Sequence, residues 1–110
     1  MSDEVVTQVD PIAALLAAVK TYLQITWTDE NYDARLTQLI YAGEEYINGK
    51  YGAIIDYSNP GMAQTLLFEF VRYGRDGAMD VFENNYRSLI LALQHDRMVD
   101  AYVDTETDSV

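Results

Sequence analysis

Apolar residues recur at three- and four-residue steps along most of this chain, the spacing that places them on one face of an α-helix. Four such blocks follow one another between residues 10 and 97. We therefore predict an all-α fold, a compact bundle of four main helices. The pattern is clearest from Thr28 to Gly49, where the apolar positions are Tyr32, Leu36, Leu39, Ile40 and Ile47.

Capping residues and prolines mark where the helices should begin. Asp10 offers a side-chain oxygen to the free N–H groups of a first turn and Pro11 suits that turn, so a helix should start there. Thr28 should cap the second helix, with Asp29 and Glu30 favourable at its positive end. The expected helices comprise residues 10–23, residues 28–49, residues from 59 to between 73 and 77, and residues 78–94.

Glycine and asparagine mark the other helix limits. Asn48-Gly49 should end the second helix in a left-handed conformation, and Asn59-Pro60 should start the third. Gly43 lies inside the second helix, where glycine costs about 1 kcal/mol relative to alanine, so we expect a close helix crossing there. The buried side of the fourth helix should consist of Val81, Phe82, Tyr86, Leu89, Ile90 and Leu93.

The length of 110 residues fits a single domain. We expect residues 1–9 to form a flexible leader and residues 10–97 to form the helical domain. Residues 98–110 contain four acidic residues and no basic one, so they should form a flexible acidic tail. Lys50 to Ser58 should be an ordered interhelical loop, with or without a short extended piece.

The charge excludes several classes of partner. Seven basic and eighteen acidic residues give a net charge of −11, which repels phosphate backbones and anionic lipid surfaces. Neither specific nucleic-acid binding nor membrane binding is therefore expected. The charge serves either solubility alone or a surface that faces a polyanion without binding it.

Several cofactor and targeting classes are also excluded. The chain has no cysteine, which rules out thiolate zinc sites, iron–sulfur clusters and disulfides. Met1 to Glu4 is acidic where a secretory signal would be basic. The longest apolar run, Ile12 to Val19, is far shorter than the roughly 20 residues that span a bilayer.

No candidate catalytic or metal site is convincing, so we expect a protein that is not an enzyme and carries no cofactor. His95 stands beside Asp96 without a nucleophile, and a surface position at a helix end explains it better. The carboxylates of residues 29–33 suit a helix start and lack EF-hand spacing. Gly74 to Gly77 should be an interhelical turn and not a phosphate loop, and Glu44-Glu45 should be a solvated face.

Nine tyrosines are many for this length, and tyrosine is enriched at protein interfaces. Tyr32, Tyr46 and Tyr86 fit core positions. Other tyrosines and nearby apolar residues do not, so we interpret them as surface that a second copy or another protein covers, although scattered exposed aromatic residues are also normal. These candidate interface residues are Tyr41, Tyr51, Ile54, Ile55, Tyr57, Met98, Val99, Tyr102 and Val103.

Residues 12–97 resemble the small head-tail connector (adaptor) proteins of tailed bacteriophages. The first half carries that family's pattern of a short helix ending in K-x-Y-L-x-I at Lys20 to Ile25, an acidic turn at Asp29-Glu30, and a long helix ending in E-Y-I at Glu45 to Ile47. Gly43 stands where the family would have alanine. In the second half, residues 63–77 and 82–87 resemble the third helix and the start of the last one.

The resemblance implies a structural virion protein. Copies would form a ring of about a dozen subunits through a repeated head-to-tail contact. The ring would dock beneath the portal protein, meet a tail-side or stopper protein, and extend a channel through which DNA passes without specific binding. The protein would then occur at the head-tail interface of the virion, and in the host cytoplasm during assembly. The alternative is a small cytoplasmic helical interaction module or regulator that acts as a monomer or dimer.

Overall fold

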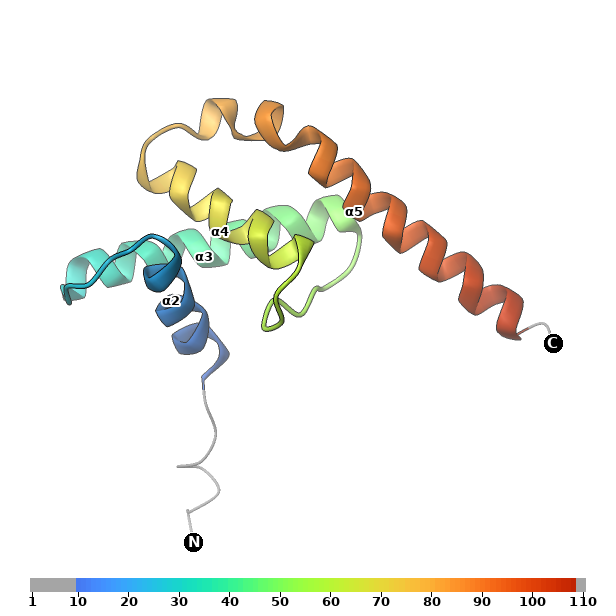
Figure 1. Cartoon of the computed structure of the whole chain (residues 1–110), viewed down its shortest axis with the longest axis horizontal. Coiled ribbons are helices and arrows are strands. Elements are labelled where there is room, and N and C mark those ends of the chain that lie inside the picture. Colours follow the sequence, from blue (N-terminus) through green and yellow to red (C-terminus); the bar gives the residue numbers. More distant parts are fainter. Residues whose placement is uncertain (1–9, 109–110) are drawn as a thin grey trace, which may run out of the picture.

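The computed structural model describes residues 10–108, with side chains described as far as Asp100, and this range contains four helices and no strand. The predicted all-α fold of four main helices is confirmed. The expected leader, residues 1–9, lies outside the described residues. In chain order the helices are α2 (Pro11–Tyr22), α3 (Glu30–Tyr51), α4 (Met62–Arg75) and α5 (Met79–Asp108) (Figure 1).

The first two helices begin with aspartate caps. The Asp10 carboxylate accepts a hydrogen bond from the Ile12 backbone N–H at 3.1 Å, and proline occupies the first helical position, as predicted. α3 is capped by Asp29 and not by Thr28, because the Asp29 carboxylate reaches the N–H groups of the following turn at 2.9 and 3.3 Å. An aspartate in this position also places a negative charge at the positive end of the helix.

Two predicted helix limits are wrong. α3 does not stop at Asn48-Gly49 but continues to Tyr51, and the left-handed residue that ends it is Gly52, with φ 92°. α4 does not begin at Asn59-Pro60, which lie in the loop, but at Met62 after Gly61. In both places the helix limit lies at a glycine further along the chain than the predicted one: Gly52 ends α3, and Gly61 precedes α4.

α5 is much longer than expected. Its backbone is helical to Asp108 and continues across the expected boundary between residues 97 and 98, so the helix does not end near Gln94. Residues 78–108 contain no glycine or proline that would end it. The helix bends at Tyr86 (φ −115°, ψ 18°) and then projects from the other helices, which makes the molecule a plate of 53 × 48 × 19 Å (Figure 1).

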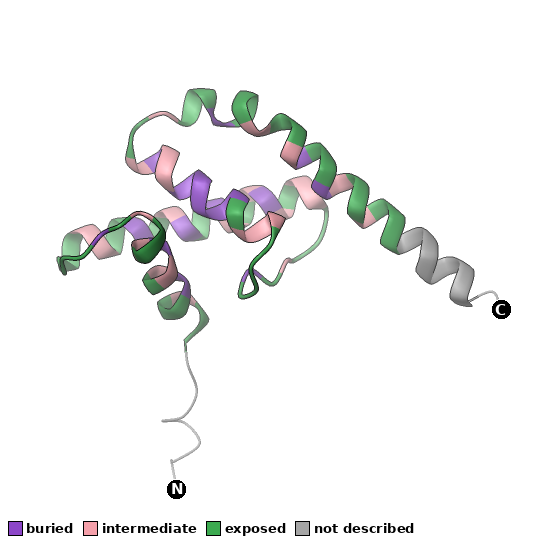
Figure 2. Ribbon diagram, in the orientation of Figure 1, coloured by how far each residue is buried: buried purple, intermediate pink, exposed green. Residues whose placement is uncertain are grey.

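The core lies where α4 packs on α3, with α2 and α5 added on either side. Figure 2 shows buried residues gathered along α4 and on the facing side of α3. Every residue from Leu66 to Val71 is buried, so the middle of α4 is covered nearly all round. Five of the six residues predicted to form the buried side of α5 are buried or half-buried. Val81 is exposed instead, whereas Phe82 beside it is almost fully buried.

Two glycines allow α3 and α4 to lie close together. A Cβ at Gly43 of α3 would stand 2.7 Å from Leu67 and 2.9 Å from Phe70 of α4. A Cβ at Gly74 of α4 would stand 2.7 Å from Leu39 of α3. Contacts this short are far inside van der Waals distance, so the predicted close crossing at Gly43 is confirmed.

A buried carboxylate joins three of the helices. Glu69 of α4 is 5% exposed, although it lies within an apolar run. Its carboxylate accepts hydrogen bonds from Arg72 Nε at 3.0 Å, from the Tyr86 hydroxyl at 2.7 Å and from the Tyr22 hydroxyl. Burial alone would raise the pKa of Glu69, but these donors outweigh burial and lower it below the usual value. The carboxylate therefore stays charged and holds the ends of α2 and α5 against α4.

The close crossing predicts opposite effects of one substitution at two glycines of α3. Gly43→Ala should lower the free energy of unfolding by about 1–3 kcal/mol, because Leu67 and Phe70 must move to admit the methyl group. Gly49→Ala is the control and should raise it by about 0.5–1 kcal/mol, since no atom lies within 4 Å of the new Cβ. Urea denaturation measures both, and equal effects would contradict the crossing.

The hydrogen bond from Tyr22 to Glu69 predicts a cost for removing one hydroxyl. Tyr22→Phe should lower the free energy of unfolding by about 1–2 kcal/mol, because a buried carboxylate loses a donor. Tyr41→Phe should change it by no more than about 0.5 kcal/mol, because Tyr41 is exposed and its hydroxyl bonds to none of the described residues. A Tyr22→Phe variant as stable as the Tyr41→Phe control would show that Glu69 does not need this donor.

Candidate interaction surface

The loop between α3 and α4 is held by side chains from both helices. Asn48, near the end of α3, accepts hydrogen bonds through Oδ1 from the Tyr57 hydroxyl at 2.7 Å and from the Ile55 N–H at 3.2 Å. Gln64, in the first turn of α4, donates from Nε2 to the Tyr57 carbonyl at 3.1 Å. The loop is thus ordered, as predicted, and has no extended strand.

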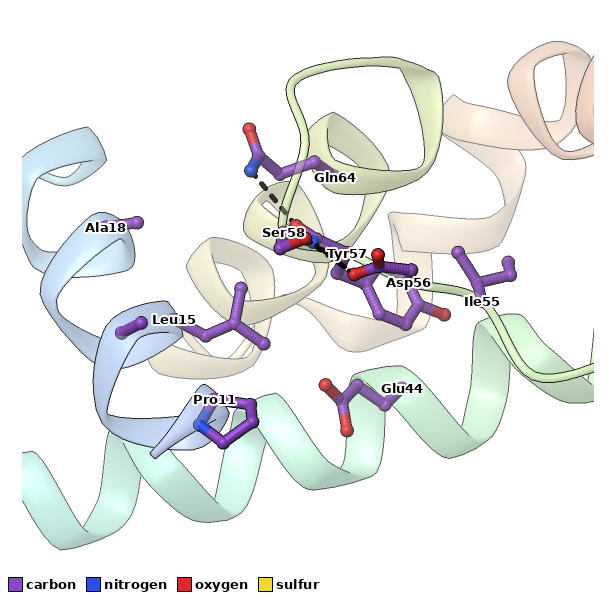
Figure 3. Close-up of a pocket in the computed structure, with 10 residues that line it drawn as sticks. Pro11, Leu15, Ala18, Glu44, Ile55, Asp56, Tyr57, Ser58 and Gln64 are labelled. Carbon is purple, nitrogen blue, oxygen red and sulfur yellow. Dashed lines mark hydrogen bonds between the residues drawn. The ribbon is translucent and has the colours of Figure 1, made fainter. Parts of the chain in front are cut away.

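A pocket of about 230 Å³ lies between this loop and α2. Pro11, Leu15 and Ala18 of α2 form one wall, and residues 55–58 of the loop form the other (Figure 3). The carboxylate of Glu44 on α3 lies on a third side, as Figure 3 shows. The pocket therefore combines apolar walls with a carboxylate.

Glu44 is not the solvated residue that the sequence suggested. It is half-buried, whereas Glu45 beside it is exposed as predicted. No hydrogen bond or ion pair joins Glu44 to any residue that the structure describes, and burial raises its pKa above the usual value. The sequence could have predicted this burial, because Glu44 lies four residues after Ile40 and three before Ile47, on the apolar side of α3.

Tyr57 forms the back of the pocket. It is 3% exposed, so its predicted role as accessible interface surface is wrong: the hydrogen bonds to Asn48 and from Gln64 draw the ring into the core. Burial, and then the nearby charge of Glu44, raise the pKa of the Tyr57 hydroxyl well above its usual range. Because that hydroxyl donates to Asn48, it leaves Glu44 unpaired.

A wider groove of about 480 Å³ lies on the other side of the same loop, against α5. Its sides include Ile54 and Ile55 of the loop and Leu93 of α5, and Asp96 and Asp100 also line it. Two contacts from α5 to the end of α3 fix its width. The Gln94 side chain donates to the Lys50 carbonyl at 2.8 Å, and the Arg97 guanidinium lies 5.5 Å from the centre of the Tyr51 ring.

The other predicted interface residues divide into three groups. Ile54 is 90% and Met98 69% exposed, and Tyr41 and Val99 are also well exposed. Tyr51 and Ile55 are half-buried beside the loop. Tyr102 and Val103 lie outside the residues whose side chains the structure describes. The structure thus brings Ile54 and Ile55 together in the groove and leaves Tyr41 apart on α3.

The sequence did not single out several exposed apolar residues. Trp27 and Tyr22 lie at the connection between α2 and α3, where Trp27 packs only partly on Tyr32 at 5.9 Å between ring centres. Leu91 lies on α5, seven residues before Met98 and so on the same face. Each of these residues lies outside the set of apolar positions that define the predicted helix faces, and that departure could have indicated an exposed apolar residue.

The residues weighed as catalytic or metal ligands have structural roles. Asp29 caps α3, and Asp33 pairs with Lys20 of α2 at 3.0 Å. Gly74 to Gly77 end α4 and form the turn into α5, as predicted. His95 is exposed on α5. Among the described residues no group of three or more acidic or histidine side chains is arranged to hold a metal ion, and none of the helices there is long and apolar enough to cross a membrane.

The bonds to Asn48 predict that one side chain orders the loop. Asn48→Ala should lower the free energy of unfolding by about 1–3 kcal/mol, because the buried Tyr57 hydroxyl loses its acceptor. Hydrogen exchange at the Ile55 amide should accelerate, while helix content by circular dichroism stays unchanged. Gln38→Ala, on an exposed position of the same helix, is the control for the change in helix propensity. Unchanged exchange at Ile55 in Asn48→Ala would contradict this role.

Comparisons of the chain with protein-family models, with curated proteins and with solved structures find no match. What the protein does is therefore inferred from its own residues. The features that bear on it are the exposed apolar side chains, the pocket beside Glu44 and the acidic surface.

Proposed function

We propose that the chain is a structural subunit of the phage head-tail connector type and not an enzyme. In this proposal copies form a ring that docks beneath a portal protein, meets a tail-side protein and extends the DNA channel at the head-tail interface of the virion. The sequence resemblance across residues 12–97 supports it. The all-α order of four helices agrees with that resemblance.

The observation that carries the proposal is the position of the exposed apolar residues. Tyr22 and Trp27 lie at the α2–α3 connection, and Leu91, Met98 and Val99 lie on α5. Ile54, the most exposed of these apolar residues, lies in the loop between α3 and α4. In Figure 1 the α2–α3 connection lies at the left of the molecule, and α5 extends from the top towards the right. Different apolar regions on separate elements suit a head-to-tail contact, which closes into a ring when the rotation between neighbours allows it.

The acidic surface sets conditions on such a ring. Copies that each carry a net charge of −11 repel one another, so apolar contacts must outweigh that repulsion. The same charge would keep DNA from adhering to a channel wall. Salt screens repulsion between exposed charges over about 10 Å at 0.1 M, so assembly should increase with ionic strength.

Native mass spectrometry tests the proposal on the full chain, alone and mixed with a phage portal ring, at about 0.05 and 0.5 M ammonium acetate. We expect ring-sized assemblies, or about one copy bound per portal subunit, with more assembly at the higher salt. A monomer or dimer that ignores the portal at both concentrations would contradict the connector and favour a small interaction module.

In the same experiment Ile54→Asp should weaken assembly roughly tenfold, since a buried isoleucine contributes about 1.5 kcal/mol or more. Helix content should not change, because Ile54 is 90% exposed. Asn84→Asp is the control, as it adds the same charge at an exposed position of α5. Equal weakening by both variants would attribute the effect to charge alone, and loss of helix in Ile54→Asp would place Ile54 in the core.

A further inference from the structure

We propose that the pocket between α2 and the interhelical loop binds a lysine or arginine side chain that a partner protein presents. This inference does not depend on ring formation. The pocket offers an apolar path that ends at an unpaired carboxylate, and a long aliphatic stem with a cationic end is the protein side chain that matches both features.

The walls suit an aliphatic stem. Leu15 of α2 points towards Tyr57 of the loop (Figure 3), and Ala18 and Ile55 also line the pocket. The volume of about 230 Å³ is suited to one side chain rather than a whole helix. The loop wall is held by the hydrogen bonds to Asn48 and from Gln64, so the pocket exists before a partner arrives.

The charges suit a cationic end. Among the described residues, Glu44 and Asp56 are the carboxylic acids that line the pocket, and none of the residues lining it is basic. Asp56 has one partner, Ser58, whose hydroxyl and N–H both donate to Asp56 Oδ1 at 2.7 and 3.0 Å. Glu44 has none among the described residues, and on α3 its neighbours one turn away are Ile40, Tyr41, Ile47 and Asn48. A cation beside Glu44 would offset the cost of its burial.

Other occupants fit these charges less well. The chain's own residues 1–9 carry Asp3 and Glu4 and no basic residue, so like charges would meet in the pocket. A second copy of the chain also carries a net charge of −11. Four of its seven basic residues are already in ion pairs, and Arg97 lies over Tyr51. The other two, Arg35 and Arg87, are exposed, but their approach would bring the acidic surface of the second copy against this one. A basic partner protein gains from both the pocket and the overall charge.

Two small probes test the pocket on the full-length protein labelled with nitrogen-15. In NMR titrations n-butylammonium should shift the amide signals of Glu44, Ile55 and Ser58 at millimolar concentration, and n-butanol should bind about tenfold more weakly because it lacks the charge. Equal binding of the two probes would overturn the proposal, as would shifts spread over all acidic surfaces.

Matched variants assign the effect to one carboxylate. Glu44→Gln should weaken n-butylammonium binding about tenfold, whereas Glu45→Gln, an equal loss of charge at the exposed neighbouring position, should weaken it less than about twofold. Glu44→Gln removes a charge that is poorly solvated, so the fold should persist, and circular dichroism checks this. Equal weakening by both variants would overturn the proposal.

A peptide pair separates a presented side chain from a free amine. A blocked tripeptide with lysine between two leucines should bind at the same amide signals, and its analogue with norleucine in place of lysine should not. Binding of n-butylammonium without binding of the lysine peptide would overturn the proposal in favour of a small-amine site. A chain that stays monomeric and ignores the portal in native mass spectrometry, but still binds the lysine peptide, would reject the connector and leave this site in place.

Discussion

The Glu69 carboxylate fixes how three of the four helices meet. Burying a charge in an apolar run costs several kcal/mol unless donors surround it, and no single neighbour can supply them all. The donors come from Arg72 on α4, Tyr22 at the end of α2 and Tyr86 at the bend of α5. A shift of α2 or α5 along α4 would remove the Tyr22 or the Tyr86 donor and leave the charge with Arg72 and one tyrosine only. The carboxylate therefore selects one arrangement of the helices, beyond what apolar packing alone would favour.

The pocket follows from the contact between α3 and α4. Gly43 lets one side of α3 press against α4, and the next residue, Glu44, lies about 100° further round the helix, towards α2 and the loop. The loop is tied to both helices that it connects, by Asn48 and Gln64. Because α2 stands on one side of this loop and α5 on the other, the loop has an opening on each side. The pocket and the groove thus share one wall.

Features that depend on nearby residues could be predicted from the sequence, and features set by tertiary contacts could not. Periodicity gave the four helices, and the cap at Asp10 is local. The end of α3 was wrong because both Gly49 and Gly52 can end a helix, and the contact with α5 beside Gly52 is invisible in the sequence. Glu44 was predicted to be solvated and Glu69 was not considered, although both stand at apolar positions of their helices. A carboxylate at an apolar position of a helix indicates a buried or half-buried charge, and this cannot be seen from the number of acidic residues alone.

The acidic charge decides what each surface can bind. Ion pairs within the chain occupy Lys20, Lys50, Arg72 and Arg75, so contact between two copies gains little from charge and must come from apolar residues. Such residues include Trp27 at the α2–α3 connection, Ile54 in the loop and Met98 on α5. At the pocket, by contrast, charge favours binding, because the unpaired Glu44 attracts a cation. Another copy, which is strongly acidic, is poorly placed to supply that cation. The exposed apolar residues therefore suit self-association, and the pocket suits a different, basic protein.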